Sequence, residues 1–308
     1  MSSLQITLND IPSLDGRVAV ITGAATGIGF AAARILATKG ATVHILDIKP
    51  EEESELQGDE RDRFSNIHYR RCNIASWADL RDAFDSIGVV HIAIANAGVS
   101  EEQHGSYFDD KFDAEGRLEP ANWDILSVNY RAVLDFVKIA WSNMRKHETV
   151  GSIVITASVS SYMTEQALPV YSTTKAALIA LVRSLRSVVI KDGITINAVA
   201  PCGTATPSMV PEFLKSMEDR GLAVSSPDVV GLALAYSATA LQERMVDLYG
   251  KDQQDELFKK GRWNGRCILT LGETYTEIEQ PLADLKPFWF GQDNVQQIRR
   301  QQATTDFR

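Results

Sequence analysis

The chain has 308 residues, of which 44% are hydrophobic and 23% charged, so it is long and apolar enough to bury one large core. Its net charge of −9 and isoelectric point near 5.1 exclude the basic stripe that a nucleic acid needs. The first fifteen residues include Asp10 and Asp15 and form no signal peptide, and no apolar run reaches membrane-spanning length. We therefore expect a soluble, cytoplasmic protein with no nucleic-acid or membrane partner.

Short β-branched runs alternate along the chain with longer amphipathic segments. Such alternation predicts right-handed β-α-β crossovers and a parallel sheet covered by helices on both faces. Seven buried strands are expected, at residues 17–21, 42–46, 66–70, 89–95, 152–156, 194–200 and 267–271. No linker divides the chain, so we expect one domain over residues 1–280 and a polar C-terminal extension over 281–308.

The first strand runs directly into a glycine-rich turn. Gly23, Gly27 and Gly29 follow it and open a helix, where small residues let a pyrophosphate approach the backbone amides. A tight turn without a ligand would look the same. The second strand ends in Asp47, where a carboxylate can accept hydrogen bonds from an adenosine ribose and repel a 2′-phosphate. If that repulsion costs about 3 kcal/mol, NAD is preferred over NADP by about a hundredfold.

Two observations leave that preference open. Lys49 lies close to Asp47 in the sequence and would weaken the repulsion, and Asp47 could also be a solvated loop residue. The cysteines Cys72, Cys202 and Cys267 are odd in number and far apart, which fits reduced thiols rather than disulfides or a zinc site. We expect no metal.

Six motifs in order resemble the short-chain dehydrogenase/reductase family over residues 15–275. They are TGAATGIG at residues 22–29, CNI at 72–74, NAG at 96–98, SVNY at 127–130, TAS at 156–158, and the YxxxK pair Tyr171 and Lys175, with Tyr171 thirteen residues after Ser158. The resemblance implies a single-domain Rossmann-type three-layer α/β/α sandwich with a seven-stranded parallel sheet. A narrower resemblance is to fungal NAD-dependent members akin to 15-hydroxyprostaglandin dehydrogenase, some of them in secondary metabolism.

The resemblance implies four catalytic residues, Asn129, Ser158, Tyr171 and Lys175. A free tyrosine has a pKa near 10, and bringing it near 7 takes about 4 kcal/mol of preferential stabilisation of the phenolate. Lys175 lies one helical turn from Tyr171 and would supply that stabilisation. Ser158 would bind the substrate oxygen, and Asn129 would hold a water that passes protons from Lys175 to solvent.

The resemblance also implies a set of NAD-binding residues. Asn73 stands where the family usually has Asp beside the adenine, and Lys175 would also hold ribose hydroxyls. The full set is Gly23, Thr26, Gly27, Ile28, Gly29, Asp47, Ile48, Asn73, Ile74, Asn96, Ala97, Gly98, Tyr171, Lys175, Thr204 and Thr206.

The chain departs from the family after the sixth strand, where Cys202 replaces the first glycine of the usual Pro-Gly turn and Gly203 follows. Thr204 would offer its amide and Thr206 its hydroxyl to the nicotinamide carboxamide, although the turn is shifted by one residue. Cys202 has no local base and is expected to be a small buried residue.

The substrate side is expected to be apolar. In the family, a lid follows the sixth strand, here at about 204–225, and Met209, Phe213 and Met217 would give it one apolar face. The loop at 100–120 would rim the same mouth, with His104 as a loop residue, and the segments 241–263 and 281–308 would cover a pocket or a partner subunit.

The helix after Tyr171 is expected to be buried on all sides, because residues 176–182 are apolar throughout. In the family this helix also packs against a neighbouring subunit, so we expect a homodimer or homotetramer. Its companion helix would carry Tyr130, Leu134, Val137 and Trp141, which plain core packing explains equally well.

These features predict an NAD-dependent dehydrogenase that oxidises a secondary alcohol of a bulky hydrophobic molecule to a ketone, with Tyr171 as the acid/base. Three alternatives remain: an NAD(P)H-dependent ketone reductase, a non-redox isomerase, dehydratase or cyclase on the same fold, and a dinucleotide-sensing partner protein.

Overall fold

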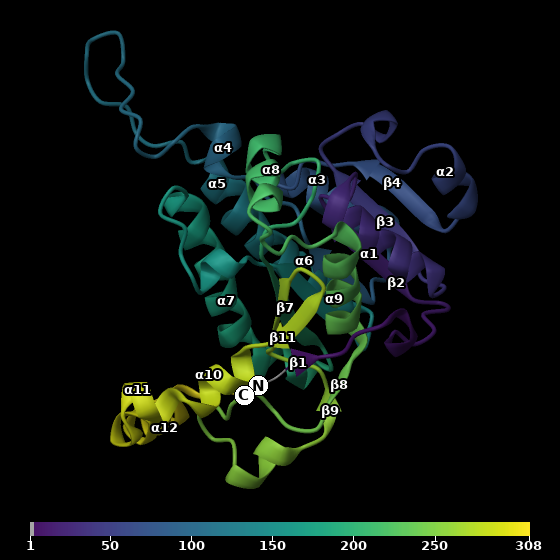
Figure 1. The fold of residues 1–308 in the computed structure, drawn as a ribbon. Helices are drawn as coiled ribbons and strands as arrows, with labels where there is room; N and C mark the ends of the chain where they lie inside the picture. Colours follow the sequence, from purple (N-terminus) through teal and green to yellow (C-terminus); the bar gives the residue numbers. More distant parts are fainter. Residues whose placement is uncertain (1–2) are drawn as a thin grey trace.

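The computed structural model describes residues 3–308 and contains a nine-stranded central sheet (Figure 1). All seven expected strands are present and run parallel. They are β2 (Val18–Thr22), β3 (Thr42–Asp47), β4 (Ile67–Arg71), β5 (Ile92–Ala95), β6 (Ser152–Thr156), β7 (Thr195–Pro201) and β10 (Cys267–Leu271). The strand order is β1-β11-β10-β7-β6-β5-β2-β3-β4. The order reverses between β2 and β5, so a crevice for ligands is expected beyond their carboxyl ends.

The sheet has two more strands than the seven expected, because β11 (Thr274–Glu277) pairs antiparallel with β10 and β1 (Ser3–Leu4) pairs antiparallel with β11. Gly272, at a φ of +54°, makes the two-residue turn from β10 to β11 possible. Three of the four residues of β11, TYTE, are polar, so its pattern lacks the continuous apolar run of a buried parallel strand.

Helices cover both faces of the sheet, which gives the expected three layers of helices, sheet and helices. One face carries α1 (Gly27–Thr38) and α9 (Pro227–Thr239), which pack closely because a side chain at Gly231 would lie 2.7 Å from the backbone nitrogen of Ala32. The other face carries α3 (Trp77–Ile87), α6 (Ala132–Lys146) and α7 (Pro169–Val189). Two apolar cores result, one on each side of the sheet.

Shorter elements connect these layers. They are η1 (Leu8–Asp10), η2 (Glu51–Glu53), α2 (Asp59–Arg63), α4 (Glu101–His104), α5 (Asp124–Leu126), η3 (Ser127–Arg131), η4 (Val159–Ser161), η5 (Ile190–Asp192), α8 (Pro211–Asp219), β8 (Leu241–Gln242), η6 (Gln254–Phe258), β9 (Gly261–Arg262), α10 (Glu279–Asp284), α11 (Lys286–Phe290) and α12 (Gln292–Thr305). Within residues 3–308, no helix is both long and apolar enough to cross a membrane.

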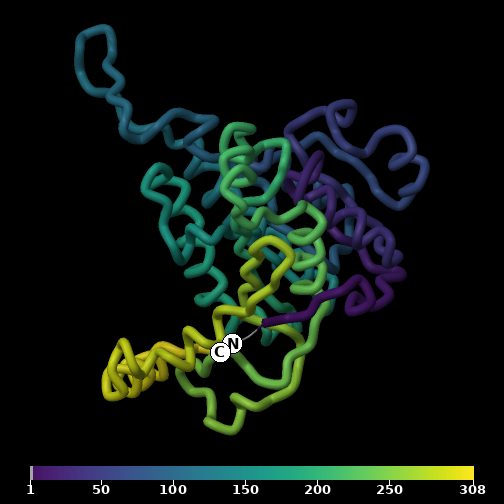
Figure 2. Tube along the Cα trace, in the orientation of Figure 1, coloured from purple at the N-terminus to yellow at the C-terminus, as the bar shows by residue number. Residues whose placement is uncertain are grey.

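The loop at 100–120 does not rim the mouth as expected. Only its first part, α4, lies against the body, and the rest projects away from the molecule as a long arm (Figures 1 and 2). A bridge between Phe112 and Leu118 closes the arm, yet the Phe112 side chain is 59% exposed. The end of the arm is therefore not packed against the body of the chain.

The two C-terminal segments pack on each other. Arg244 pairs with Asp284 at 2.8 Å, and Arg308 reaches back to Asp252 at 2.7 Å. Glu279, at the start of α10, accepts two hydrogen bonds of 2.8 Å from Arg183 and so ties the extension to α7. Phe288, Trp289 and Phe290 form an exposed aromatic tip on α11. Phe288 is 85% exposed, so the aromatic tip covers no pocket of this chain.

The helix α7 is not buried on all sides. Thr173, Ala180 and Ser184 form an exposed strip along it, while Leu178 and Val182 are buried. Periodicity alone assigns small side chains on an apolar helix to the protein core. Such side chains equally permit a close approach by another helix.

Candidate active site

The glycine turn after β2 is shaped by contacts that a side chain would block. Gly23 and Gly27 have φ angles of +63° and +62°, which favour glycine. A Cβ on Gly23 would lie 2.6 Å from the Cα of Ala97, and one on Gly29 would lie 2.5 Å from the carbonyl oxygen of Gly23. The turn therefore has no side chain of its own over the backbone at the start of α1, next to Thr26 and Ile28, and this cradle fits a dinucleotide pyrophosphate.

Asp47 lies at this turn rather than in a solvated loop. Its carboxylate is buried at the end of β3 and accepts hydrogen bonds from the amides of Ala25, at 2.9 Å, and Lys49, at 3.0 Å. The next residue, Ile48, is exposed. Asp47 thus stabilises the glycine turn through the Ala25 amide. It lies at the strand end where the sequence predicts the adenosine ribose.

Sequence reasoning missed Glu55. Its carboxylate accepts a hydrogen bond of 2.8 Å from the amide of Gly27, and its own amide donates to the carbonyl of Ala25. A carboxylate therefore already uses one of the amides at the start of α1. The signal was the acidic run EEESE at residues 51–55, close after Asp47.

The NAG motif at the end of β5 locks the glycine turn to the sheet. The Asn96 amide donates to the carbonyl oxygens of Thr22 and Gly23, at 3.2 and 2.8 Å, and its Oδ1 accepts from Thr156. The amide of Ala97 donates to the Thr22 hydroxyl. These bonds give Asn96 and Ala97 a clear structural role in holding three strand ends together.

Asn73 and Ile74 lie just after the end of β4, the strand that pairs with β3. Asn73 Oδ1 accepts from the amide of Ala75, which forms a local turn and leaves the Nδ2 group free to donate. Ile74 is buried against the core beside it.

Asn129 lies in a π-helical turn, η3, immediately before α6. Such turns often mark functional sites. Its side chain is fully buried and makes two hydrogen bonds of 2.8 Å, one accepted from the amide and one donated to the carbonyl of Val99. A Cβ on Gly98 would lie 3.3 Å from both Asn129 Oδ1 and Lys175 Nζ, so Gly98 keeps space open between them.

Ser158, Tyr171 and Lys175 lie close together in the structure. Ser158 caps η4 after β6 and is buried, and α7 carries the other two residues on one face. Lys175 Nζ lies 5.5 Å from the centre of the Tyr171 ring and donates to the Thr156 carbonyl at 2.9 Å. Because an ammonium has three donors, two remain for other partners.

The charges around this trio differ from the expectation. Burial raises the pKa of the Tyr171 phenol, a hydrogen bond with the Ser158 side chain lowers it, and Glu101 and Glu102 raise it further. The Tyr171 pKa is therefore raised overall rather than lowered as expected, because burial is the largest effect on it. Burial also lowers the pKa of Lys175 to about 8, so Lys175 can exchange a proton near neutral pH.

The chain after β7 closes over the glycine turn. A Cβ on Gly27 would lie 3.3 Å from the Thr206 methyl group, so Thr206 faces the start of α1. Thr204 is buried and donates to the Cys202 carbonyl. Cys202 is half-buried rather than buried, and burial raises the pKa of its thiol, which disfavours a nucleophilic thiolate.

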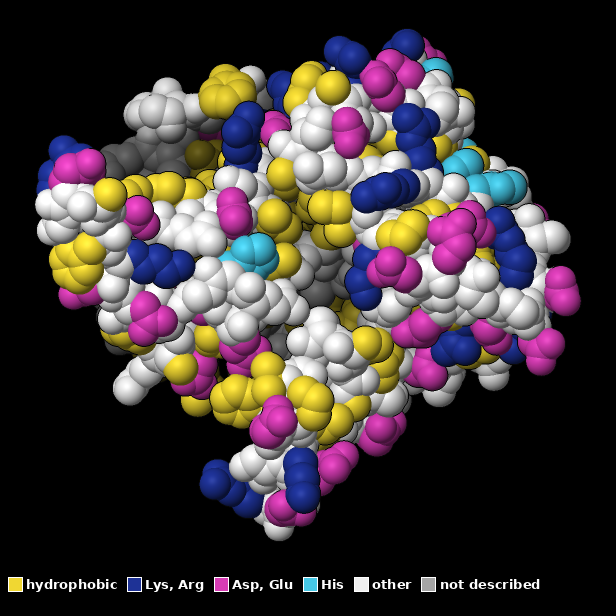
Figure 3. Space-filling view, turned by 90° about the horizontal axis from the view of Figure 1, so that it is seen from above, with side chains coloured by type: hydrophobic (Ala, Val, Ile, Leu, Met, Phe, Trp, Pro, Cys, Tyr) yellow, Lys and Arg dark blue, Asp and Glu magenta, His cyan; other side chains and the backbone are white. Residues whose placement is uncertain are grey.

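The proposed lid approaches Gly203 through two methionines. A Cβ on Gly203 would lie 2.9 Å from the Met217 sulfur and 4.0 Å from the Met209 methyl group, whereas Phe213 is 54% exposed. Seen from the side on which α4 and α8 lie, the surface is hollowed near its centre, with hydrophobic side chains around the hollow (Figure 3). His104 stays in the loop, 3.7 Å from Asp124.

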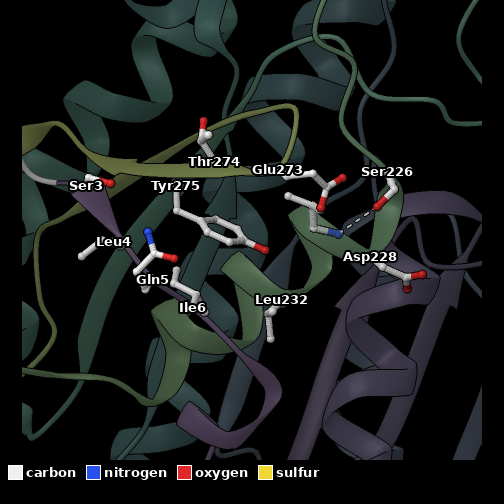
Figure 4. Close-up of a pocket in the computed structure, with 11 residues that line it drawn as sticks. Ser3, Leu4, Gln5, Ile6, Ser226, Asp228, Leu232, Glu273, Thr274 and Tyr275 are labelled. Atoms are coloured by element: carbon white, nitrogen blue, oxygen red, sulfur yellow. Dashed lines mark hydrogen bonds between the residues drawn. The ribbon is translucent and has the colours of Figure 1, made fainter.

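A separate cavity of about 400 Å³ lies at the far sheet edge, between β1, β11 and α9 (Figure 4). Tyr275 points across it. None of its lining residues is a predicted site residue. Within residues 3–308, no group of three His, Cys, Asp or Glu side chains could hold a metal ion.

The fold and this arrangement define an oxidoreductase-type dinucleotide site on a Rossmann-like sheet. The family model for short chain dehydrogenases matches residues 17–216, and the chain belongs to this family of NAD(P)-dependent oxidoreductases.

Two fungal relatives match along the whole chain. The short-chain dehydrogenase/reductase ATR7 of Stachybotrys chlorohalonatus is 47% identical and covers 100% of this chain and 95% of its own length. The short-chain dehydrogenase/reductase prx4 of Penicillium roqueforti is 48% identical and covers 100% of this chain and 90% of its own length. These names do not support the narrower likeness to 15-hydroxyprostaglandin dehydrogenase.

Solved structures agree on the fold. A 3-ketoacyl-(acyl-carrier-protein) reductase from Brucella melitensis, complexed with NADH, has a TM-score of 0.63 at 23% identity and covers 84% of this chain and 98% of its own. A putative 2-deoxy-D-gluconate 3-dehydrogenase from Agrobacterium tumefaciens, with bound NADP, has a TM-score of 0.60 at 24% identity and covers 74% and 90%. One holds NADH and the other NADP, so the likeness does not decide the cofactor.

Proposed function

We propose that this protein is an NAD-dependent dehydrogenase that oxidises a secondary alcohol of a bulky hydrophobic molecule to a ketone. The observation that carries this proposal is the meeting of Ser158, Tyr171 and Lys175 at the carboxyl ends of the strands, beside the glycine turn. The buried Asp47 supports NAD over NADP, because a 2′-phosphate would lie against its carboxylate.

In this proposal, Tyr171 takes the proton of the substrate hydroxyl, and Ser158 hydrogen-bonds the same oxygen. A bound NAD would supply the hydride acceptor for the carbinol carbon. Lys175 stabilises the phenolate through its charge and uses its remaining donors for ribose hydroxyls. It also passes a proton towards Asn129, and its pKa of about 8 suits that exchange.

The cofactor would be held by residues from five strand ends, those of β2, β3, β4, β5 and β7. Gly23, Thr26, Gly27, Ile28 and Gly29 would cradle the pyrophosphate, Asp47 and Ile48 the adenosine ribose, Asn73 and Ile74 the adenine, Asn96, Ala97 and Gly98 the central part, and Thr204 and Thr206 the carboxamide. The free Nδ2 group of Asn73 and the approach of Thr206 to Gly27 support two of these assignments.

Other parts of the proposal concern context. The exposed strip of Thr173, Ala180 and Ser184 supports a homodimer or homotetramer through α7. The fungal relatives support a substrate from secondary metabolism. A cytoplasmic location and a domain boundary at residue 280 remain predictions.

The main alternative is a ketone reductase, because the equilibrium permits the reaction in both directions. The Glu55 carboxylate and the Lys49 ammonium would also alter the preference between NAD and NADP. A non-redox reaction is disfavoured by the complete set of hydride-transfer residues.

Calorimetric titration with NAD and NADP, followed by a screen of hydrophobic secondary alcohols, tests the proposal. We expect tighter binding of NAD and a rise in absorbance of the reduced nicotinamide as ketone forms. Tighter NADP binding would favour the reductase, and product formation without an absorbance change would contradict redox chemistry.

A further inference from the structure

The N-terminus of α7 is capped by a side chain from another part of the chain. Pro169, the first residue of α7, has no N–H, and the amide of Ser172 already donates to the Leu168 carbonyl. The free amides of the first turn are therefore those of Val170 and Tyr171. Leu168, the local cap residue, supplies no side-chain hydrogen bond.

Glu101 accepts from both free amides. Its Oε1 accepts from Val170 at 2.6 Å, and its two carboxylate oxygens accept from Tyr171 at 3.1 and 3.2 Å. The Glu101 side chain is only 4% exposed, although it lies on a short loop helix. A buried carboxylate at the positive end of a 21-residue helix is favourable, and all of its observed partners belong to the turn that carries Tyr171.

The short segment that leads to Glu101 links the other parts of the site. Asn96 holds the glycine turn, Val99 holds both polar groups of Asn129, and Glu101 holds the start of α7. A shift of Glu101 would therefore move the Tyr171 hydroxyl relative to Ser158 and to the glycine turn.

We propose that Glu101 is a positioning residue that fixes Tyr171 at the first turn of α7, and that its charge sets the pH range in which Tyr171 takes a proton. This inference rests on the proposed role of Tyr171. The Glu101 carboxylate, at the first turn of α7, opposes formation of the Tyr171 phenolate, whereas the Lys175 ammonium, on the same helix, favours it.

The other charged groups near Tyr171 are few. Glu102 belongs to the same short helix as Glu101 but is exposed and contacts no amide of α7. From α5, which packs on α7, Asp124 lies 3.7 Å from His104. From η3, which also packs on α7, Arg131 lies 3.9 Å from Asp135. Among η4 and its flanks, Tyr162 donates to Glu279 at 2.7 Å.

The test uses the full chain and needs no substrate. The phenol of Tyr171 is titrated by NMR of protein labelled at the tyrosine Cζ, with Tyr171→Phe to assign the signal. Glu101→Gln keeps an acceptor oxygen and removes the charge, so we expect the Tyr171 midpoint to fall by about one pH unit. Glu102→Gln is the matched control, and we expect a shift of less than half of that.

Positioning is measured separately by hydrogen exchange. In Glu101→Ala, we expect the amides of Val170 and Tyr171 to exchange at least about tenfold faster, whereas Glu102→Ala leaves them unchanged. Equal titration shifts in Glu101→Gln and Glu102→Gln, no shift in either, or unchanged exchange in Glu101→Ala would overturn the inference. Failure of the proposed function would appear elsewhere, as retained turnover in Tyr171→Phe.

Discussion

The two sides of the active site are held in different ways. On the cofactor side, the polar groups of Asp47, Asn96 and Glu55 bond to the backbone of the glycine turn, so few of them can move alone. On the substrate side, α8 has no buried residue, and its Phe213 side chain is 54% exposed. The cofactor side is thus preformed, while the substrate side can change its shape at little cost to the fold.

The largest expected effect falls where the two sides meet. Tyr171→Phe removes the proton acceptor, so turnover should fall by about 10²- to 10⁴-fold. Cofactor affinity should stay within a few-fold, because the ring and Lys175 remain. Steady-state rates and calorimetry measure both. Retained turnover would show that another group carries the proton.

A pair of glycine substitutions compares the stiffness of the two sides. Gly29→Ala would place a Cβ 2.5 Å from a backbone oxygen and should lower the free energy of unfolding by about 3 kcal/mol. Gly203→Ala would meet only flexible methionine side chains, Met217 at 2.9 Å and Met209 at 4.0 Å, and should cost less than about 1 kcal/mol. Denaturant unfolding measures both. Equal costs would contradict the comparison.

The next effect concerns the choice of cofactor. Asp47→Ala removes the carboxylate that would repel a 2′-phosphate, so the NAD preference should narrow by about ten- to a hundredfold. The ratio of NAD to NADP dissociation constants measures it, and Glu52→Ala, an exposed neighbour, is the control. An unchanged ratio would remove Asp47 from the ribose site and leave Glu55 as the nearest carboxylate.

The smallest effect is expected at the exposed aromatic tip. Phe288→Ser should change the stability of the single chain by less than about 0.5 kcal/mol, because that side chain is mostly in solvent already. Thermal unfolding at low protein concentration measures this. Phe136→Ser, in the buried core, is the contrast and should be severe. A large loss in Phe288→Ser would mean that the tip is covered in solution.

The sequence by itself determined the seven parallel strands, the glycine turn and the meeting of Ser158, Tyr171 and Lys175. The reason is that these features depend on short-range patterns: strand periodicity, backbone angles that require glycine, and i, i+4 spacing on one helix. The order of strand ends in a parallel sheet then brings them together at one edge.

Only the tertiary structure decided where Glu55 and Glu101 lie, that the arm leaves the body and that α7 keeps an exposed strip. Glu101 meets Tyr171 across 70 positions of sequence, and Glu55 meets Gly27 across 28. Nothing in the local pattern of an acidic residue distinguishes a solvated side chain from one that caps a distant helix. That distinction depends on which unpaired backbone amides the fold places beside it.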